Sequence, residues 1–129
     1  MTRGESTKIL LVEDDPTQAM MYQQEFVNAG YAVIMAETGQ LALQLAATEE
    51  PDLIFLDMVL SDMSGMDILR SLKSDSRTKD IKVVILSNLQ KKELADEARS
   101  HGALDFLVKM QFIPKDIVNK AEKYLEGGQ

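Results

Sequence analysis

The sequence contains no cysteine, which excludes disulfides, thiolate nucleophiles and cysteine-ligated zinc sites. It also has no apolar run near the roughly 20 residues that a membrane-spanning helix needs. The polar residues Met1 to Lys8 show no signal-peptide pattern. We therefore expect a cytoplasmic protein without a membrane partner, and the absence of cysteine fits such a reducing compartment.

Basic side chains are in the minority, with 14 lysines and arginines against 21 acidic residues and a net charge of −7. An acidic surface repels phosphate backbones, so direct nucleic acid binding is not expected. The 129 residues, 45% of them hydrophobic and 27% charged, suit one compact domain. No linker or repeat interrupts the chain, and we expect a single domain over 1–129 with frayed ends at 1–7 and 126–129.

Short apolar runs alternate with amphipathic segments along the whole chain. The runs predict buried strands at 8–12, 31–36, 53–56, 81–86 and 104–108. Helices are predicted after each strand, with Asp15 and Thr38 as N-caps and Gly65 opening the third helix. The last helix is predicted to start at about Ile113, with an apolar residue every four positions at Ile113, Ile117, Ala121 and Leu125. This fivefold alternation of strand and helix predicts an α/β fold, (βα)5, with a parallel five-stranded sheet covered by helices on both faces.

Groups suited to phosphate or metal chemistry follow four of these strands. In an open parallel sheet, ligands bind outside the carboxyl ends of the strands. The residues at this edge are Glu13, Asp14, Asp15, Asp57, Ser87, Asn88 and Lys109.

The carboxylates predict a cation at this edge. Asp14 and Asp57 follow strands that we expect to be neighbours, and like charges so close need neutralising. Mg²⁺ suits one or two carboxylates plus waters. Asp15 is explained more simply as a helix cap. Lys109, after a buried strand, can pair with Asp57 as a structural ion pair or bind phosphoryl oxygens, and Ser87 can donate to one. Together these groups predict phosphoryl transfer to Asp57.

Four segments resemble the receiver domains of two-component response regulators, and the resemblance covers nearly the whole chain in order. They are Leu-Val12-Glu13-Asp14-Asp15, Leu56-Asp57, Ile85-Leu86-Ser87 and Phe106-Leu107-Val108-Lys109. The resemblance implies a doubly wound, flavodoxin-like sheet with strand order 2-1-3-4-5.

The resemblance also implies a role for each site residue. Asp57 is the implied phosphoacceptor, and the implied ligands of Mg²⁺ are Glu13, Asp14, Asp57 and the backbone carbonyl of Val59. The residues implied to contact the phosphoryl group are Ser87, Lys109 and Asn88. Ser87 and Phe106 are the implied switch residues. The implied donor is a histidine kinase or phosphotransfer protein. An unknown downstream protein reads the fourth helix, fifth strand and fifth helix. We expect a monomer or weak dimer, and no enzyme activity beyond the domain's own phosphorylation and dephosphorylation.

The sequence departs from the family pattern at several positions. Met110 stands where the family usually has proline, and Asn88 where it usually has a small residue. Val59 and Leu89 flank the site with apolar bulk, and we expect them to hinder the hydrolytic water. Two alternatives stay open: a pseudo-receiver that binds partners without phosphorylation, and a Mg²⁺-dependent phosphohydrolase of the haloacid dehalogenase type. The hydrolases commonly carry a second Asp where this chain has Val59.

Overall fold

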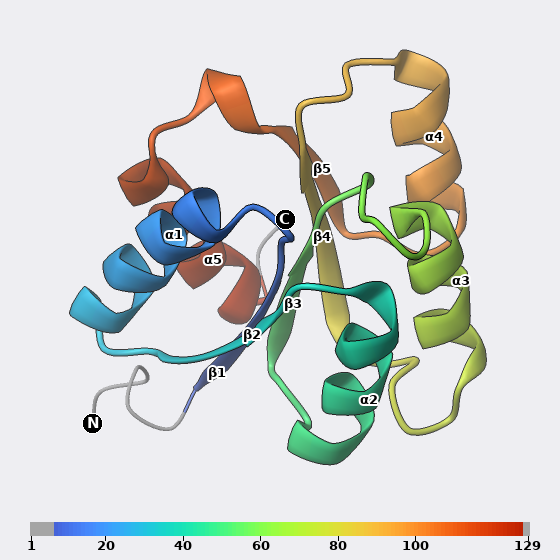
Figure 1. Ribbon diagram of the computed structural model, residues 1–129, viewed down its shortest axis with the longest axis horizontal. Helices are drawn as coiled ribbons and strands as arrows, with labels where there is room; N and C mark the ends of the chain where they lie inside the picture. Colours follow the sequence, from blue (N-terminus) through green and yellow to red (C-terminus); the bar gives the residue numbers. More distant parts are fainter. Residues whose placement is uncertain (1–6, 128–129) are drawn as a thin grey trace.

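A central parallel sheet organises the chain (Figure 1). The computed structural model describes residues 7–127. Its five strands lie in the order β2-β1-β3-β4-β5, so the predicted strand order is confirmed. Their bounds are β1 Lys8–Val12, β2 Ala32–Ala36, β3 Leu53–Leu56, β4 Lys82–Ser87 and β5 Asp105–Val108.

Helices cover both faces of this sheet, as the alternating pattern predicts. Figure 1 shows α1 and α5 on one side and α2, α3 and α4 on the other. The helices are α1 Pro16–Asn28, α2 Gly39–Glu49, α3 Gly65–Ser74, α4 Lys92–Ser100 and α5 Pro114–Leu125, with a 3-10 turn at Lys109–Gln111. No helix of residues 7–127 is long and apolar enough to cross a membrane.

Two apolar cores form because successive side chains of a strand point to opposite faces. Ile9 and Leu11 of β1 pack with α1 and α5, whereas Leu10 and Val12 pack with α2, α3 and α4. All four residues of β3 are fully buried. The uninterrupted apolar runs are therefore explained by burial on both faces, which holds the polar strand ends in fixed positions at one edge of the sheet.

Side-chain caps fix where the helices begin, since the first backbone N–H groups of a helix have no internal partner. The Asp15 carboxylate accepts hydrogen bonds from the N–H groups of Thr17 and Gln18, as predicted for an N-cap. Thr38 caps α2 through its hydroxyl, confirming the second predicted cap.

The last helix and the chain ends differ from the predictions. Helix α5 begins at Pro114, and Ile113, predicted to lie on its apolar face, is 61% exposed. The buried face is Ile117, Val118, Ala121 and Tyr124. Fraying was also wrong for Thr7, which is buried and whose carbonyl accepts the Ala32 N–H. The rest of the predicted frayed N-terminus, 1–6, and residues 128–129 lie outside the described residues.

Candidate functional site

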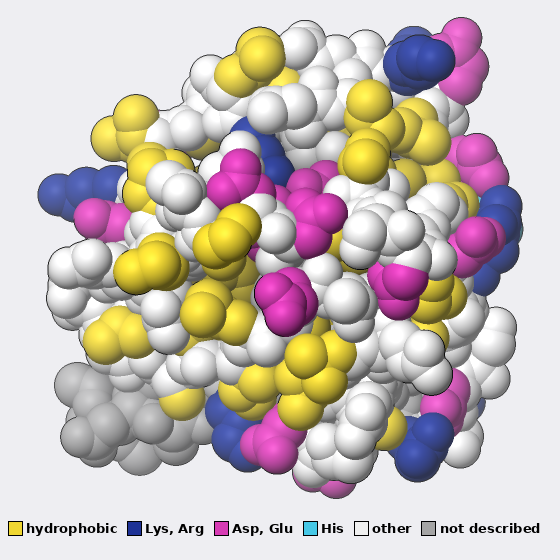
Figure 2. Space-filling model, in the orientation of Figure 1, with side chains coloured by type: hydrophobic (Ala, Val, Ile, Leu, Met, Phe, Trp, Pro, Cys, Tyr) yellow, Lys and Arg dark blue, Asp and Glu magenta, His cyan; other side chains and the backbone are white. Residues whose placement is uncertain are grey.

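A hollow of about 320 Å³ opens at the carboxyl ends of β1, β3, β4 and β5. This is the topological switch point of the sheet: the chain passes from β1 to β2 on one side of β1 and then crosses to β3 on the other side. Figure 2 shows acidic side chains gathered over this part of the molecule, with a basic side chain among them. The lining residues are Glu13, Asp14, Asp15, Gln18, Asp57, Val59, Ser87, Asn88, Leu89 and Lys109.

Asp57 lies at the floor of this hollow, directly after β3, and is only 8% exposed. Its backbone N–H donates to the carbonyl of Val12 on the neighbouring strand. One carboxylate oxygen accepts the N–H of Val59 at 3.2 Å and the other accepts Lys109 Nζ at 2.8 Å. Gly65 packs so closely that a Cβ there would lie 2.5 Å from the Met58 Cα and closer still to the Asp57 carbonyl oxygen. Asp57 is therefore held by backbone on both sides.

Lys109 crosses the hollow and joins three side chains. Its ammonium donates to the carboxylates of Asp57 and Glu13 and to the amide oxygen of Gln18, the last at 2.8 Å. Burial alone would lower the pKa of Lys109, but the hydrogen bonds and charges of Asp57 and Glu13 outweigh it and raise that pKa above its ordinary value. The lysine is a fixed cation, and the predicted ion pair with Asp57 is confirmed.

The two other carboxylates of the site differ in exposure. Glu13 is 5% exposed, and its second oxygen accepts the N–H of Asp15 at 3.1 Å. Asp14 is exposed to solvent. Within residues 7–127 no three acidic or histidine side chains converge as a preformed metal cluster. Lys109 bonds both Glu13 and Asp57.

The oxygen donors nevertheless fit a hard divalent cation. Mg²⁺ keeps several waters and needs only one or two carboxylates with substrate oxygens, and the hollow offers carboxylates without sulfur or histidine. Val59 and Ser64 form an isolated antiparallel bridge. The hydrogen bond of this bridge runs from the Gly65 N–H to the Met58 carbonyl, so the bridge does not use the Val59 carbonyl.

The ends of β4 and β5 bring the remaining predicted residues to the site. Ser87 is 1% exposed, and its hydroxyl oxygen accepts the N–H of Leu89 at 3.4 Å, so its hydrogen is not used by that bond. The amide oxygen of Asn88 accepts the N–H of Met110 at 3.0 Å. Phe106 is half-buried against the core of α2, α3 and α4. It lies on β5, away from the hollow's lining.

Sequence reasoning missed two residues of the site, Gln18 and Gly65. Gln18 lies in the first turn of α1, three residues after the N-cap Asp15, and its partner Lys109 is 91 residues away in the sequence, so the contact depends on the tertiary fold. Gly65 was assigned only to a helix start. Its contact with the backbone of Asp57 depends on how α3 meets β3, which no local pattern shows.

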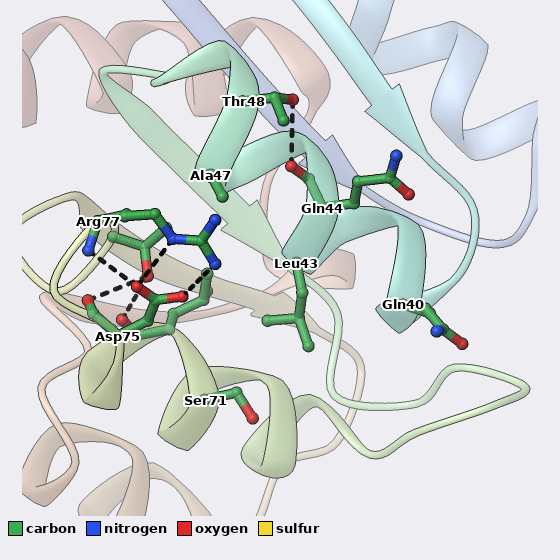
Figure 3. Close-up of a pocket in the computed structure, with 10 residues that line it drawn as sticks. Gln40, Leu43, Gln44, Ala47, Thr48, Ser71, Asp75 and Arg77 are labelled. Carbon is green, nitrogen blue, oxygen red and sulfur yellow. Dashed lines mark hydrogen bonds and ion pairs between the residues drawn. The ribbon is translucent and has the colours of Figure 1, made fainter.

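A second hollow, of about 460 Å³, lies between α2 and α3, away from the carboxyl ends of the strands (Figure 3). Its charged lining residues are Asp75 and Arg77, which bind each other through 2.8 and 3.2 Å contacts. The side-chain and backbone hydrogen bonds of Arg77 lower the pKa of Asp75 to about 2. Neutral side chains make up the rest, so among the described residues the one carboxylate of this larger hollow is already paired with its one cation, and no second acidic residue lies beside them as at the first hollow.

Comparison with known proteins agrees with the geometry. A family model described as the response regulator receiver domain matches residues 9–122. Sporulation initiation phosphotransferase F of Bacillus subtilis is 31% identical over 118 residues, which cover 92% of this chain and 93% of that protein. The regulatory protein LuxO of Vibrio cholerae is 36% identical over 99 residues, covering 77% of this chain but only 21% of LuxO.

The chain thus spans about a fifth of the length of LuxO, a longer relative, and nearly all of the Bacillus protein. Among solved structures, the Vibrio cholerae chemotaxis protein CheY4 superposes with a TM-score of 0.83 at 27% identity, over 90% of this chain and 96% of that one. The family is one of signalling domains in two-component and phosphorelay systems rather than classical enzymes. By fold, by sequence over nearly its whole length and by its relatives, the chain belongs to the response regulator receiver domains.

Proposed function

We propose that this receiver domain accepts a phosphoryl group on Asp57, with Mg²⁺ as its metal ion. The contact of Lys109 with both Asp57 and Glu13, beside an open hollow, is the observation that carries the proposal. A cation, an adjacent acidic pair and a carboxylate facing an open space are the parts that transfer of a phosphoryl group to a carboxylate requires.

In the transfer, an Asp57 carboxylate oxygen attacks the phosphorus of a phosphorylated histidine. The new O–P bond forms as the P–N bond breaks, and the imidazole leaves with its electron pair and takes up a proton. Lys109, kept protonated by its raised pKa, faces the equatorial oxygens together with the Ser87 hydroxyl. The backbone contacts of Asp57 keep its attacking oxygen in place, and good positioning is a large part of such catalysis.

The solved structure of the response regulator Rcp1, which is similar in fold, is a Mn²⁺-bound form, and in this proposal Glu13, Asp14, Asp57 and the Val59 carbonyl would hold the metal ion here. The ion supplies neutralisation of charge on the phosphoryl oxygens. Lys109 already bonds Glu13 and Asp57, so it screens the same carboxylates before any metal binds. Asp14, being exposed, can bind a hydrated cation without losing a buried partner.

The donor in this proposal is a histidine kinase or a phosphotransfer protein, and the reader is a downstream protein that binds the surface of α4, β5 and α5. Ser87 and Phe106 lie on β4 and β5, at the border of that surface. Direct nucleic acid binding is not part of the proposal, given the net charge of −7. We propose a monomer or weak dimer.

The proposed aspartyl phosphate is long-lived. Val59, 56% exposed, and Leu89, 37% exposed, both line the hollow with apolar groups. Neither side chain can orient a water molecule for attack on phosphorus, since neither has a hydrogen-bonding group. Hydrolysis within seconds would contradict this part of the proposal.

The test is incubation with Mg²⁺ and acetyl phosphate, followed by intact mass. We expect a stable gain of one phosphoryl group that requires Mg²⁺ and is absent in Asp57→Asn. Exposed Asp67→Asn, on α3, is the matched control and should gain the group normally. No adduct would favour a pseudo-receiver and overturn the proposal. Continuous turnover of acetyl phosphate without an adduct would instead favour a phosphohydrolase.

A further inference from the structure

The loops that follow β4 and β5 are joined by side chains beyond the point where the sheet ends. The main-chain ladder between the two strands stops at the pair Ser87 and Val108. Past it, the Asn88 amide oxygen accepts the N–H of Met110 at 3.0 Å. The amide nitrogen of Gln90 donates to the Met110 sulfur at 3.3 Å. These two contacts continue the connection between the strands after backbone pairing has stopped.

The Asn88 bond depends on the identity of residue 110. A proline has no N–H to donate, so the bond requires a residue other than proline at position 110, and this chain has methionine there. Lys109 and Met110 lie in a 3-10 turn, Lys109–Gln111, which presents the Met110 N–H toward the β4–α4 loop. Two departures of the sequence, Asn88 and Met110, are therefore the two partners of one hydrogen bond.

The bonded residues stand next to the groups that face the phosphoryl site. Asn88 directly follows Ser87, and Met110 directly follows Lys109. Ser87 and Lys109 are nearly fully buried and fixed by the sheet below them, whereas Asn88 and Met110 are exposed at the rim. A bond at the rim ties both walls of the hollow together on the side where solvent enters.

We propose that Asn88 is a positioning residue, which through Met110 fastens the β4–α4 loop to the β5–α5 loop and holds Ser87 and Lys109 at a fixed separation around the phosphoryl group. The inference rests on the proposed phosphorylation of Asp57. With the bond in place, Leu89 stays at the mouth of the hollow and water reaches the aspartyl phosphate slowly. Without it, the loop swings outward and the phosphoryl group is lost faster.

The experiment is a double-mutant cycle on the full chain. Asn88→Ala is made in three backgrounds: Met110, Met110→Ala, which keeps the N–H, and Met110→Pro, which removes it. Each protein is phosphorylated with acetyl phosphate and Mg²⁺, the donor is removed, and the decay of the adduct is followed by intact mass. Hydrogen exchange of the residue 110 amide, measured in the unphosphorylated proteins of the Met110 and Met110→Ala backgrounds, reports the bond itself.

We expect Asn88→Ala to speed decay about three- to tenfold when residue 110 is Met or Ala, and less than about 1.5-fold when it is Pro. The size of this effect is that of losing one ordinary hydrogen bond. Comparing Asn88→Ala within the proline background cancels any distortion that proline itself brings to Lys109. The amide of residue 110 should exchange faster in Asn88→Ala.

Three results would overturn the inference: the same effect of Asn88→Ala in all backgrounds, no effect with Met110, or unchanged exchange of the residue 110 amide. Failure of the unsubstituted protein to gain a phosphoryl group would overturn the proposed function as well. If the unsubstituted protein gains the phosphoryl group normally and Asn88→Ala leaves the decay rate unchanged, only the role of Asn88 would be overturned.

Discussion

Gly65 gives the sharpest test of how the fold positions the proposed phosphorylation site, Asp57. It is the first residue of α3, and its N–H donates to the carbonyl of Met58 at 2.8 Å. A Cβ at this position would lie 2.5 Å from the Met58 Cα and even closer to the Asp57 carbonyl oxygen. Both obstacles are backbone, so no side-chain rotation relieves them. Gly65→Ala must push α3 away from β3 or displace Asp57.

Two effects of Gly65→Ala on stability oppose each other. Alanine favours a helix over glycine by at most about 1 kcal/mol. Overpacking typically costs about 1–3 kcal/mol, and the upper end applies because backbone meets backbone. The net loss in free energy of unfolding is then about 2 kcal/mol. A displacement of Asp57 near 1 Å would slow phosphorylation by up to about a hundredfold, the usual effect of misplacing a reacting group by that distance.

Gly39→Ala is the matched control, since Gly39 is the first residue of α2. Its Cβ would come closest to side-chain atoms, Ile68 Cδ1 at 2.8 Å and Met63 Sδ at 2.9 Å, with Ile68 Cγ1 at 3.1 Å, and side chains can shift where backbone cannot. We expect its stability to stay within about 1 kcal/mol of the parent. The assays are urea unfolding and the initial rate of adduct formation from acetyl phosphate. Equal behaviour of the two alanine variants in both assays would refute the reasoning.

Three further substitutions test the charges and surfaces of the site. Lys109→Ala leaves Glu13 and Asp57 buried without their cation, and we expect a loss of about 3 kcal/mol in urea unfolding, partly recovered by Mg²⁺; an equal loss with and without the ion would contradict the shared site. Val59→Asn supplies a group that can orient water, so the adduct should decay several-fold faster by intact mass, and an unchanged lifetime would count against the proposed shielding. Asp62→Ala removes the carboxylate that accepts the N–H groups of the first two residues of α2. Those bonds hold the pKa of Asp62 below its usual 3.8, so its stabilisation is present above that pH and is lost as pH falls through the lowered value. The urea midpoints of parent and variant should therefore converge as the pH is lowered below that usual value, and a constant difference would be the contrary result.

The strand pattern of the sequence was sufficient for the fold because it is local. A run such as Leu53–Leu56, buried on both faces, has no polar residue to contradict a central parallel strand. The caps at Asp15 and Thr38 are equally local, since each accepts from N–H groups two or three residues ahead. Ile113 misled the prediction because its four-residue spacing from Ile117 is helical, while Pro114 starts the helix one residue later.

The contacts within the site were harder to predict from the sequence, since they join segments that are far apart in it. The sequence placed Glu13, Asp57 and Lys109 at one edge, and that is as far as strand ends alone can go. Lys109 also bonds Glu13 and Gln18, and these contacts depend on the directions in which their side chains leave the end of β1 and helix α1.

Strand register explains why the Asn88–Met110 bond lay beyond sequence reasoning. It requires Ser87 to pair with Val108, and that pairing is set by the packing of β4 and β5 over their whole length. A shift of one residue along either strand would turn its side chains to the opposite face. It would carry Ser87 away from the hollow and separate Asn88 from the Met110 N–H. The same register therefore decides both whether Ser87 faces the proposed phosphoryl site and whether the two loops are joined, and this is how the proposed role of Asn88 at the rim reaches groups at the floor.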